Sequence, residues 1–183
     1  MDFIYNIEIR RDKGTTLAFS CFLAVLLLLP ITGMITFETL RVKAIKEELQ
    51  AASKSAAVAG AAKLLMLDEK NDIHDAQNKV LAKQKLAIET AVKAFRANVV
   101  DDIPMKSARV VTSRQEIPRA DEAIIYIQLL DPGSNPPNQP VELGDKRGRL
   151  IHVLGKFSVK PICGTYFGFN EPVTIASNGI AYA

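Results

Sequence analysis

Residues 15–37 read TTLAFSCFLAVLLLLPITGMITF, and this run contains no charged residue. About 23 residues of helix are enough to cross a hydrocarbon core of roughly 30 Å. Pro30 lies inside the run and removes one helical hydrogen bond, a loss that a membrane helix tolerates. The run therefore predicts one transmembrane anchor, with a short segment before it and a long polar part after it.

Three basic residues precede the run within residues 10–13, and three follow it within residues 41–46. The positive-inside rule alone gives only a modest bias for this distribution. The short segment 1–14 and the long polar remainder favour a cytoplasmic tail, an anchor over 15–37 in the cytoplasmic (inner) membrane, and an exported C-terminal part. A cleaved signal peptide is the alternative, but the run exceeds the usual 7–15 apolar residues and no A-x-A site closes it. A buried core helix is the other alternative.

The 183 residues carry a net charge of +3 without a block of lysine and arginine, so we expect no nucleic-acid partner. Neither His74 nor His152 has a cysteine or a carboxylate at a known metal-ligand spacing. No phosphate-binding glycine loop or nucleophile elbow is present. We therefore expect no enzyme activity, no catalytic residue, no metal site and no cofactor.

Residues 38–103 are rich in alanine and predict a helical hairpin. The first helix continues from the anchor to about residue 67, because alanine has the highest helix propensity. The second helix is expected over residues 73–98. The first helix carries a stripe of mostly small residues at helical spacing, which indicates a close packing seam. The seam packs either on the chain's own second helix or on other subunits; the stripe is Ile45, Leu49, Ala52, Ala56, Ala59 and Lys63.

Residues 104–183 change character to short β-rich runs bounded by Pro, Gly and Asn. Strands are expected over 108–113, 122–130, 150–162 and 171–183, with Gly155 as a bulge. Residues 131–140 are a proline-rich loop. The predicted fold class is therefore α+β: a transmembrane helix continuing into a long helix, a helical hairpin, and a small antiparallel β-sheet in a C-terminal β-rich domain.

Two segments, Glu38–Arg41 (ETLR) and Leu49–Ala61 (LQAASKSAAVAGA), carry a resemblance to a known family. Together they resemble the start of TadE/TadG-like proteins, the membrane-anchored, pilin-like accessory proteins of the tight-adherence (Flp) pilus system. That family has a span, an acid and an arginine three residues apart, and then an alanine-rich helix beginning Leu-Gln. The chain departs from the pattern at Ala51, which stands in place of asparagine, and at Leu40, where glycine is common. Residues 157–177 resemble the family's C-terminal end more weakly.

Two groups of candidate interaction residues follow. Glu38 and Arg41 stand one helical turn apart just after the anchor and form either an intrahelical pair or contacts with partner charges. The second group is the small-residue set Ala52, Ala56, Ala59 and Gly60.

A prepilin-type cleavage between Gly14 and Thr15 is a further candidate. The basic residues before this bond and the apolar run after it fit such processing. However, Phe19 occupies the fifth position after the bond, where prepilins usually carry glutamate.

The resemblance implies a structural and scaffolding component of a Tad-type pilus or secretion assembly. Its partners would be the lipid bilayer and other subunits of that machinery, with a homo-oligomer as a further option. One alternative is a minor pilin or pseudopilin processed after Gly14. The other is a membrane-tethered binding module unrelated to pili, whose loop at residues 132–140 contacts a ligand.

Overall fold

The computed structural model describes residues 2–68, 76–168 and 170–183. By its internal contacts the chain divides into two compact units, Met1–Arg41 and Val42–Ala183. The architecture is α+β, as the sequence predicts.

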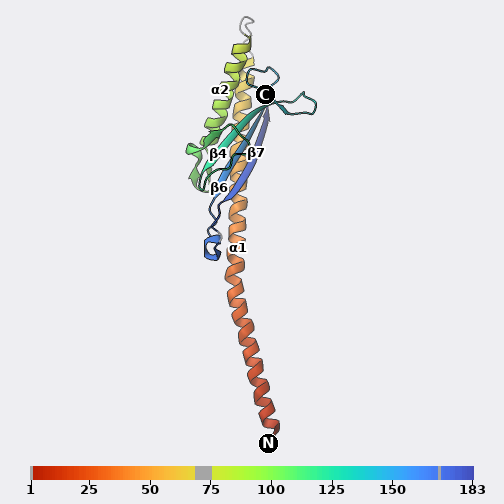
Figure 1. Ribbon diagram of the computed structural model, residues 1–183, viewed down its shortest axis with the longest axis vertical. Helices are drawn as coiled ribbons and strands as arrows, with labels where there is room; N and C mark the ends of the chain where they lie inside the picture. The colour runs from red at the N-terminus through yellow and green to blue at the C-terminus, as the bar shows by residue number, and fades with distance from the viewer. Residues whose placement is uncertain (1, 69–75, 169) are drawn as a thin grey trace. The chain divides into compact units, whose positions relative to one another are not determined.

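Helix α1 spans Asp2–Asp68 and continues through Pro30, in agreement with the predicted helix that joins the apolar run to the alanine-rich segment (Figure 1). Its first part, up to Arg41, makes up the N-terminal unit. Its remainder, from Val42, belongs to the folded C-terminal unit, where Ile45 and Leu49 are fully buried. Alanine residues at helical spacing supply both the helix propensity and the narrow buried face of this part.

Helix α2 spans Ala76–Arg96, inside the predicted range 73–98, and residues 69–75 lie outside the described part of the chain. Lys93 and Arg96 occupy its last turn, where positive charge is favourable near the carbonyl end of a helix. Asn98 closes the helix: its Nδ2 donates a hydrogen bond of 2.6 Å to the carbonyl oxygen of Ala94. Asn98 therefore caps the last turn of α2 and lies at the end of the predicted range 73–98.

A short hairpin that the sequence analysis did not predict follows α2. Strand β1 (Val99–Val100) pairs with β2 (Ile103–Pro104) in an antiparallel two-stranded sheet. The turn uses Asp101 and Asp102 with φ angles of 51° and 59°, a left-handed conformation that aspartate tolerates better than most residues. The backbone N–H of Asp101 donates to Oε2 of Glu48 at 2.8 Å, which ties the hairpin to α1.

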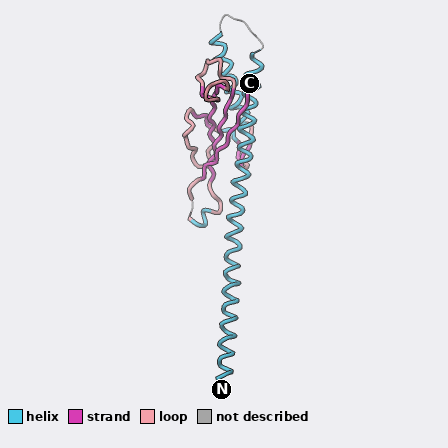
Figure 2. Tube along the Cα trace, turned by 90° about the vertical axis from the view of Figure 1, so that its right-hand side faces the viewer, coloured by secondary structure: helices cyan, strands magenta, loops and turns pink. Residues whose placement is uncertain are grey.

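The main sheet has the strand order β3-β4-β6-β7, with the short strand β5 also paired to β4. Its strands are β3 (Arg109–Val111), β4 (Ala123–Asp131), β5 (Gln139–Pro140), β6 (Leu150–Val159) and β7 (Val173–Tyr182). Figures 1 and 2 show the long strands β4, β6 and β7 running alongside the C-terminal part of α1. The four predicted strands correspond to β3, β4, β6 and β7, whereas β5 lies in the predicted loop.

The sheet is mixed, so the prediction of an antiparallel sheet is wrong for one pair. Strand β3 runs parallel to β4, with Val110 beside Ile125. Residues 112–122 connect the two strands, and this is about the length that a parallel connection requires. The remaining pairs, β4–β5, β4–β6 and β6–β7, are antiparallel.

One face of the sheet packs on the two helices and forms the core. Alternate residues of β4 and β6 point to this face, because successive side chains of a strand point to opposite sides. Phe95 of α2 and Phe157 of β6 are the largest fully buried side chains. The core also contains Ile45, Leu49, Ala52, Ala56, Ala87, Ala91, Ile125, Leu129, Ile151, Val153 and Ile175.

Candidate functional site

The apolar run of α1 is the first candidate site. Among the described residues, one helical stretch, Thr15–Met66, contains a segment long and apolar enough to cross a membrane, and none of that segment is buried. A core helix of a soluble domain would instead be mostly covered. Apart from the half-buried Met34, the large apolar side chains of the run are between 37% and 68% exposed, for example Leu17, Phe22 and Leu29. The run therefore has the composition of a membrane span and lacks the burial of a core helix.

Several hydroxyl groups of this run bond to the helix itself. Ser20 Oγ donates to the carbonyl oxygen of Thr16 at 2.8 Å, and Thr36 Oγ1 donates to that of Thr32 at 2.8 Å. The Oγ1 atom of Thr32 donates to the carbonyl oxygens of Leu28 and Leu29 at 3.0 and 2.9 Å. In hydrocarbon, where water is absent, polar groups must be satisfied within the protein, and these bonds do so.

Glu38 and Arg41 lie at the end of the N-terminal unit. Their side chains are 19% and 18% exposed, and Arg41 Nη1 lies 3.5 Å from Glu38 Oε1. The intrahelical pair is therefore present, and contacts with partner charges stay a prediction. Gly14 and Thr15, the candidate processing site, both lie within α1, and Thr15 is exposed.

The small-residue set lies inside the folded unit. Ala52 and Ala56 are completely buried, Gly60 is buried, and Ala59 is half-buried. A Cβ atom on Gly60 would lie 2.8 Å from Ile151 Cδ1, so α1 approaches the sheet as closely as a glycine allows.

The second helix meets the same position of α1. The Cβ position of Gly60 is 3.1 Å from the carbonyl oxygen of Ala87 and 3.2 Å from Ala91 Cβ. Of the two alternatives for this seam, the structure has the intramolecular one, in which α1 packs on the chain's own α2 and sheet.

Two strand glycines complete this close contact, and sequence reasoning missed their role. A Cβ atom on Gly155 would lie 2.7 Å from Ser53 Oγ and 2.8 Å from Phe95 Cε2. On Gly179, a Cβ atom would collide with the carbonyl group of Ser53. The expected bulge at Gly155 is wrong, because the residue pairs in unbroken register with Ile125 on one side and Ser177 on the other. Glycine inside a strand signals either a bulge or a close approach of other atoms. Here Gly179 admits the backbone of α1, and Gly155 leaves room for the Ser53 hydroxyl and the Phe95 ring.

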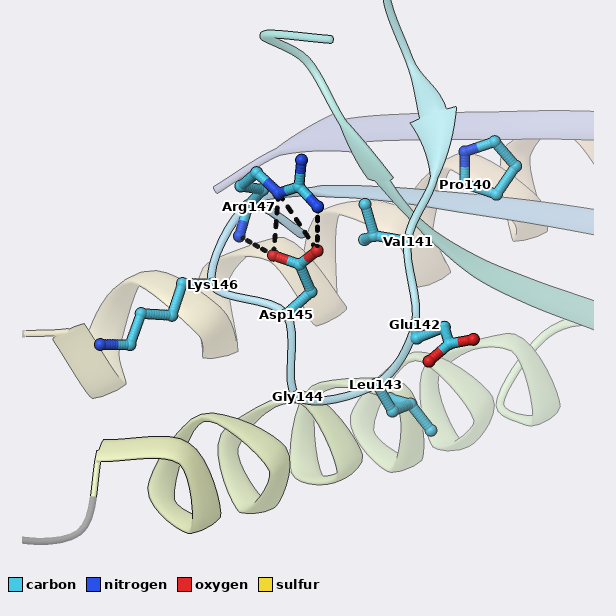
Figure 3. Close-up of a pocket in the computed structure, with 8 residues that line it drawn as sticks. All are labelled: Pro140, Val141, Glu142, Leu143, Gly144, Asp145, Lys146 and Arg147. Carbon is cyan, nitrogen blue, oxygen red and sulfur yellow. Dashed lines mark hydrogen bonds and ion pairs between the residues drawn. The ribbon is translucent and has the colours of Figure 1, made fainter.

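Residues 140–147 line an open hollow of about 830 Å³ (Figure 3). Gln84 of α2, only 2% exposed, holds this loop. Its Oε1 accepts the backbone N–H of Gly144 at 2.6 Å, and its Nε2 donates to the carbonyl oxygen of Asp145 at 2.7 Å. The loop that lines the hollow is therefore fixed to α2 by the buried side-chain amide of Gln84.

Two of the charged residues that line this hollow, Asp145 and Arg147, form an ion pair. Arg147 Nη2 donates to Asp145 Oδ2 at 2.7 Å, and Arg147 Nε donates to both carboxylate oxygens at 3.1 Å. The hydrogen bonds from Arg147 lower the pKa of Asp145, and in turn the Asp145 carboxylate raises the pKa of Arg147. The charge of this guanidinium is therefore already compensated by a bidentate carboxylate within the loop itself.

A second charged cluster fixes the start of β4. Arg109 bonds to Glu116 and donates through Nε to Glu122 Oε1 at 2.9 Å. Glu122 also accepts the backbone N–H of Arg119 at 2.7 Å. The hydrogen bonds from Arg109 and Arg119 lower the pKa of Glu122, and the two carboxylates raise the pKa of Arg109. These contacts hold the 112–122 connection against the strands.

The proline-rich loop, which the binding-module alternative assigns to a ligand, is closed on itself. Ser134 Oγ donates to the carbonyl oxygens of Asp131 and Pro136 at 2.8 Å and accepts the N–H of Gln139 at 3.0 Å.

Across the described ranges, no group of three or more His, Cys, Asp or Glu side chains is placed to hold a metal ion. Comparison with known proteins gave no matching family model, no matching curated protein and no matching solved structure.

Proposed function

We propose that this protein is a single-pass membrane protein that holds a small α+β domain at the membrane as a structural, scaffolding component of a pilus or secretion assembly. The observation that carries the anchoring is the exposed apolar run within α1, a helix whose later part is buried in a folded domain. An anchor of about 20 apolar residues is effectively permanent, whereas a single lipid chain gives only reversible attachment.

The assignment to a TadE/TadG-like assembly is supported by the sequence resemblance over residues 38–61. The proposed orientation places residues 1–14 in the cytoplasm and the domain after Phe37 outside the cytoplasmic membrane. The pseudopilin alternative uses the same features of α1, since a filament subunit also needs an exposed apolar half-helix joined to a folded head. The two readings differ in whether the bond between Gly14 and Thr15 is cut.

One experiment tests the proposal and its alternatives. Membranes from cells producing the full chain are crosslinked mildly and extracted with alkaline carbonate, and the chain is then purified for mass spectrometry of its partners and of its own N-terminus. A chain retained in the membrane, with Met1 intact and crosslinked to a pilus ATPase, platform protein or secretin, supports the proposal.

Three other outcomes would contradict parts of it. A mature chain that begins at Thr15 and crosslinks to pilin would favour the pseudopilin. A well-crosslinked sample without any such partner would remove the pilus assignment and leave a tethered binding module. Release of the chain from the membrane by carbonate would contradict the proposed transmembrane anchor itself.

A further inference from the structure

Strand β7 forms one outer edge of the main sheet and is ten residues long (Figure 1). The opposite edge is formed by two short strands, β3 with three residues and β5 with two, and β3 begins at Arg109, a side chain engaged by two carboxylates. Short edge strands and charged side chains are the usual means by which proteins prevent their edges from pairing with other chains. One edge of this sheet is protected in this way.

The β7 edge has none of these protections. Its sequence, VTIASNGIAY, contains no charged residue and no proline. It pairs with β6 without interruption from Val173 to Tyr182, so no bulge turns it away. Ile180 and Tyr182, which point away from the helices, are 54% and 64% exposed. A long, regular and uncharged edge of this kind is a template for another strand.

The hydrogen-bond pattern shows which backbone groups are available. Ala183 N donates to the carbonyl oxygen of Arg149 at 2.8 Å, next to the paired residues Leu150 and Tyr182. Antiparallel strands alternate between residues that bond to the neighbour and residues whose N–H and C=O point away. The odd-numbered residues of β7 therefore bond to β6. The even-numbered residues, which are Thr174, Ala176, Asn178, Ile180 and Tyr182, therefore direct their N–H and C=O groups away from β6, toward the open side of the edge strand.

We propose that β7 binds an extended segment of a different polypeptide, which adds to the sheet as a further strand beside β7. The row of alternating N–H and C=O groups is satisfied by the backbone of another strand, and alternate side chains supply the specificity of such additions. Since β7 carries no charge, the matching segment is uncharged along the contact, with β-branched or aromatic residues beside Ile180 and Tyr182.

The β7 strand of a second copy of this chain fits this edge less well, because of the direction in which its helix α1 would run. Ser53 of α1 bonds to Ser177, and Gly60 meets Ile151, whose partner in β7 is Ala181, so β7 and α1 run in the same direction in this unit. An antiparallel pair of β7 strands would therefore place the Val42 ends of the two helices at opposite ends of the pair. In two chains anchored in one membrane, both Val42 ends must lie on the side of the membrane, which this antiparallel pair does not allow. This step rests on the proposed membrane anchoring.

Site-specific photo-crosslinking in cells producing the full chain tests the proposal. Thr174, Ile180 and Tyr182 are replaced one at a time by p-benzoylphenylalanine, and the adducts are mapped by mass spectrometry. We expect all three adducts on one segment of one partner. Their attachment points should be about six residues apart for positions 174 and 180 and about two apart for positions 180 and 182, because both strands have the same rise.

Backbone and charge variants test the edge itself. Ala176→Pro removes an outward N–H without breaking the ladder to β6, as proline is tolerated on an edge strand. We expect loss of the Thr174 adduct with this variant and retention with the control Ala176→Val. If Ala176→Pro lowers the protease resistance of the domain, the fold itself is affected, and Ile180→Lys is used instead, with Ile180→Thr as its control.

Adducts between two β7 strands, adducts with lipid alone, or adducts scattered over unrelated segments would each overturn the proposal. Carbonate extraction of the same membranes keeps the two proposals apart. Release of the chain from the membrane refutes the anchoring, whereas a retained chain without registered adducts refutes only the strand addition.

Discussion

The backbone of Ser53 in α1 lies directly against Gly179 in β7, so that a Cβ atom on Gly179 would collide with the Ser53 carbonyl group and reach 2.6 Å from Lys54 N. Both obstacles are backbone atoms and cannot rotate away. The distance between helix and sheet in this domain is therefore set by a glycine.

We expect Gly179→Ala to destabilise the domain by about 1–3 kcal/mol or more, the usual cost of overpacking where the backbone must move. The free energy of unfolding of the full chain in detergent, measured by chemical denaturation, checks this. Gly133→Ala is the matched control, because its Cβ would lie 3.4 Å from Asp131 Oδ1, an ordinary contact. Equal stability of both variants would show that α1 does not approach β7 this closely.

Gly155→Ala should cost less, because its Cβ would meet side-chain atoms, namely Ser53 Oγ and the Phe95 ring. Part of the cost should be relieved by Ser53→Ala, since residues that share a contact are energetically coupled by about 0.5–3 kcal/mol. A double-mutant cycle on unfolding free energies measures that coupling. Strictly additive effects would contradict the arrangement of these two side chains.

Gln84→Ala should loosen the loop of residues 140–147. The variant leaves the N–H of Gly144 and the carbonyl of Asp145 without their partner, and an unsatisfied buried group costs about 1–3 kcal/mol. Hydrogen exchange at the amide of Gly144 should become faster, while amides in β6 keep their protection. Lys85→Ala, the exposed neighbour on the same helix, serves as the control. Unchanged exchange at Gly144 in Gln84→Ala would show that the loop holds its own shape.

The stability of the protein should depend on Glu122 in a pH-dependent way. Its pKa is lowered in the folded state from an ordinary value of 4.5, chiefly by the hydrogen bond from Arg109. Its stabilisation is therefore complete above pH 4.5 and is lost as the pH falls through the lowered pKa. The difference in unfolding free energy between wild type and Glu122→Gln should shrink as the pH falls below about 4.5. A difference that stays constant down to pH 2 would contradict this role.

Two arginines in the middle of the apolar run should prevent its insertion. Each arginine at the centre of a span costs about 2.5–3.5 kcal/mol on insertion scales. We expect Leu26→Arg combined with Leu27→Arg to shift the chain from the membrane pellet to the supernatant after carbonate extraction. The corresponding double alanine variant should stay in the pellet. Retention of the arginine variant would mean that another part of the chain holds it to the membrane.

The parts of the fold that depend on local composition were predictable. The apolar run, the alanine-rich helix and the four strand segments follow from short-range patterns. The parallel direction of β3 and the β1–β2 hairpin depend on which distant segments pair, and two-residue strands leave almost no pattern.

The candidate site likewise has features that the sequence shows and features that only the folded chain shows. The seam through Ala52 and Ala56 is visible in the sequence as a stripe, but the stripe does not identify its partner, because small residues suit an intramolecular and an intermolecular contact equally. The roles of Gly155 and Gln84 required the neighbours that only the folded chain brings together: Phe95 for the glycine, and the 140–147 loop for the amide.

The seam of alanine and glycine between α1, α2 and the sheet has a thermodynamic consequence. Alanine and glycine side chains have no rotamers to lose, so this interface forms without the side-chain entropy cost of a core built from leucine or methionine. It also removes little apolar surface from water, so it adds little to the heat capacity change of unfolding. Its stabilisation comes from dispersion contacts at close range. At these alanine and glycine positions, the contact is therefore determined more by shape than by hydrophobicity.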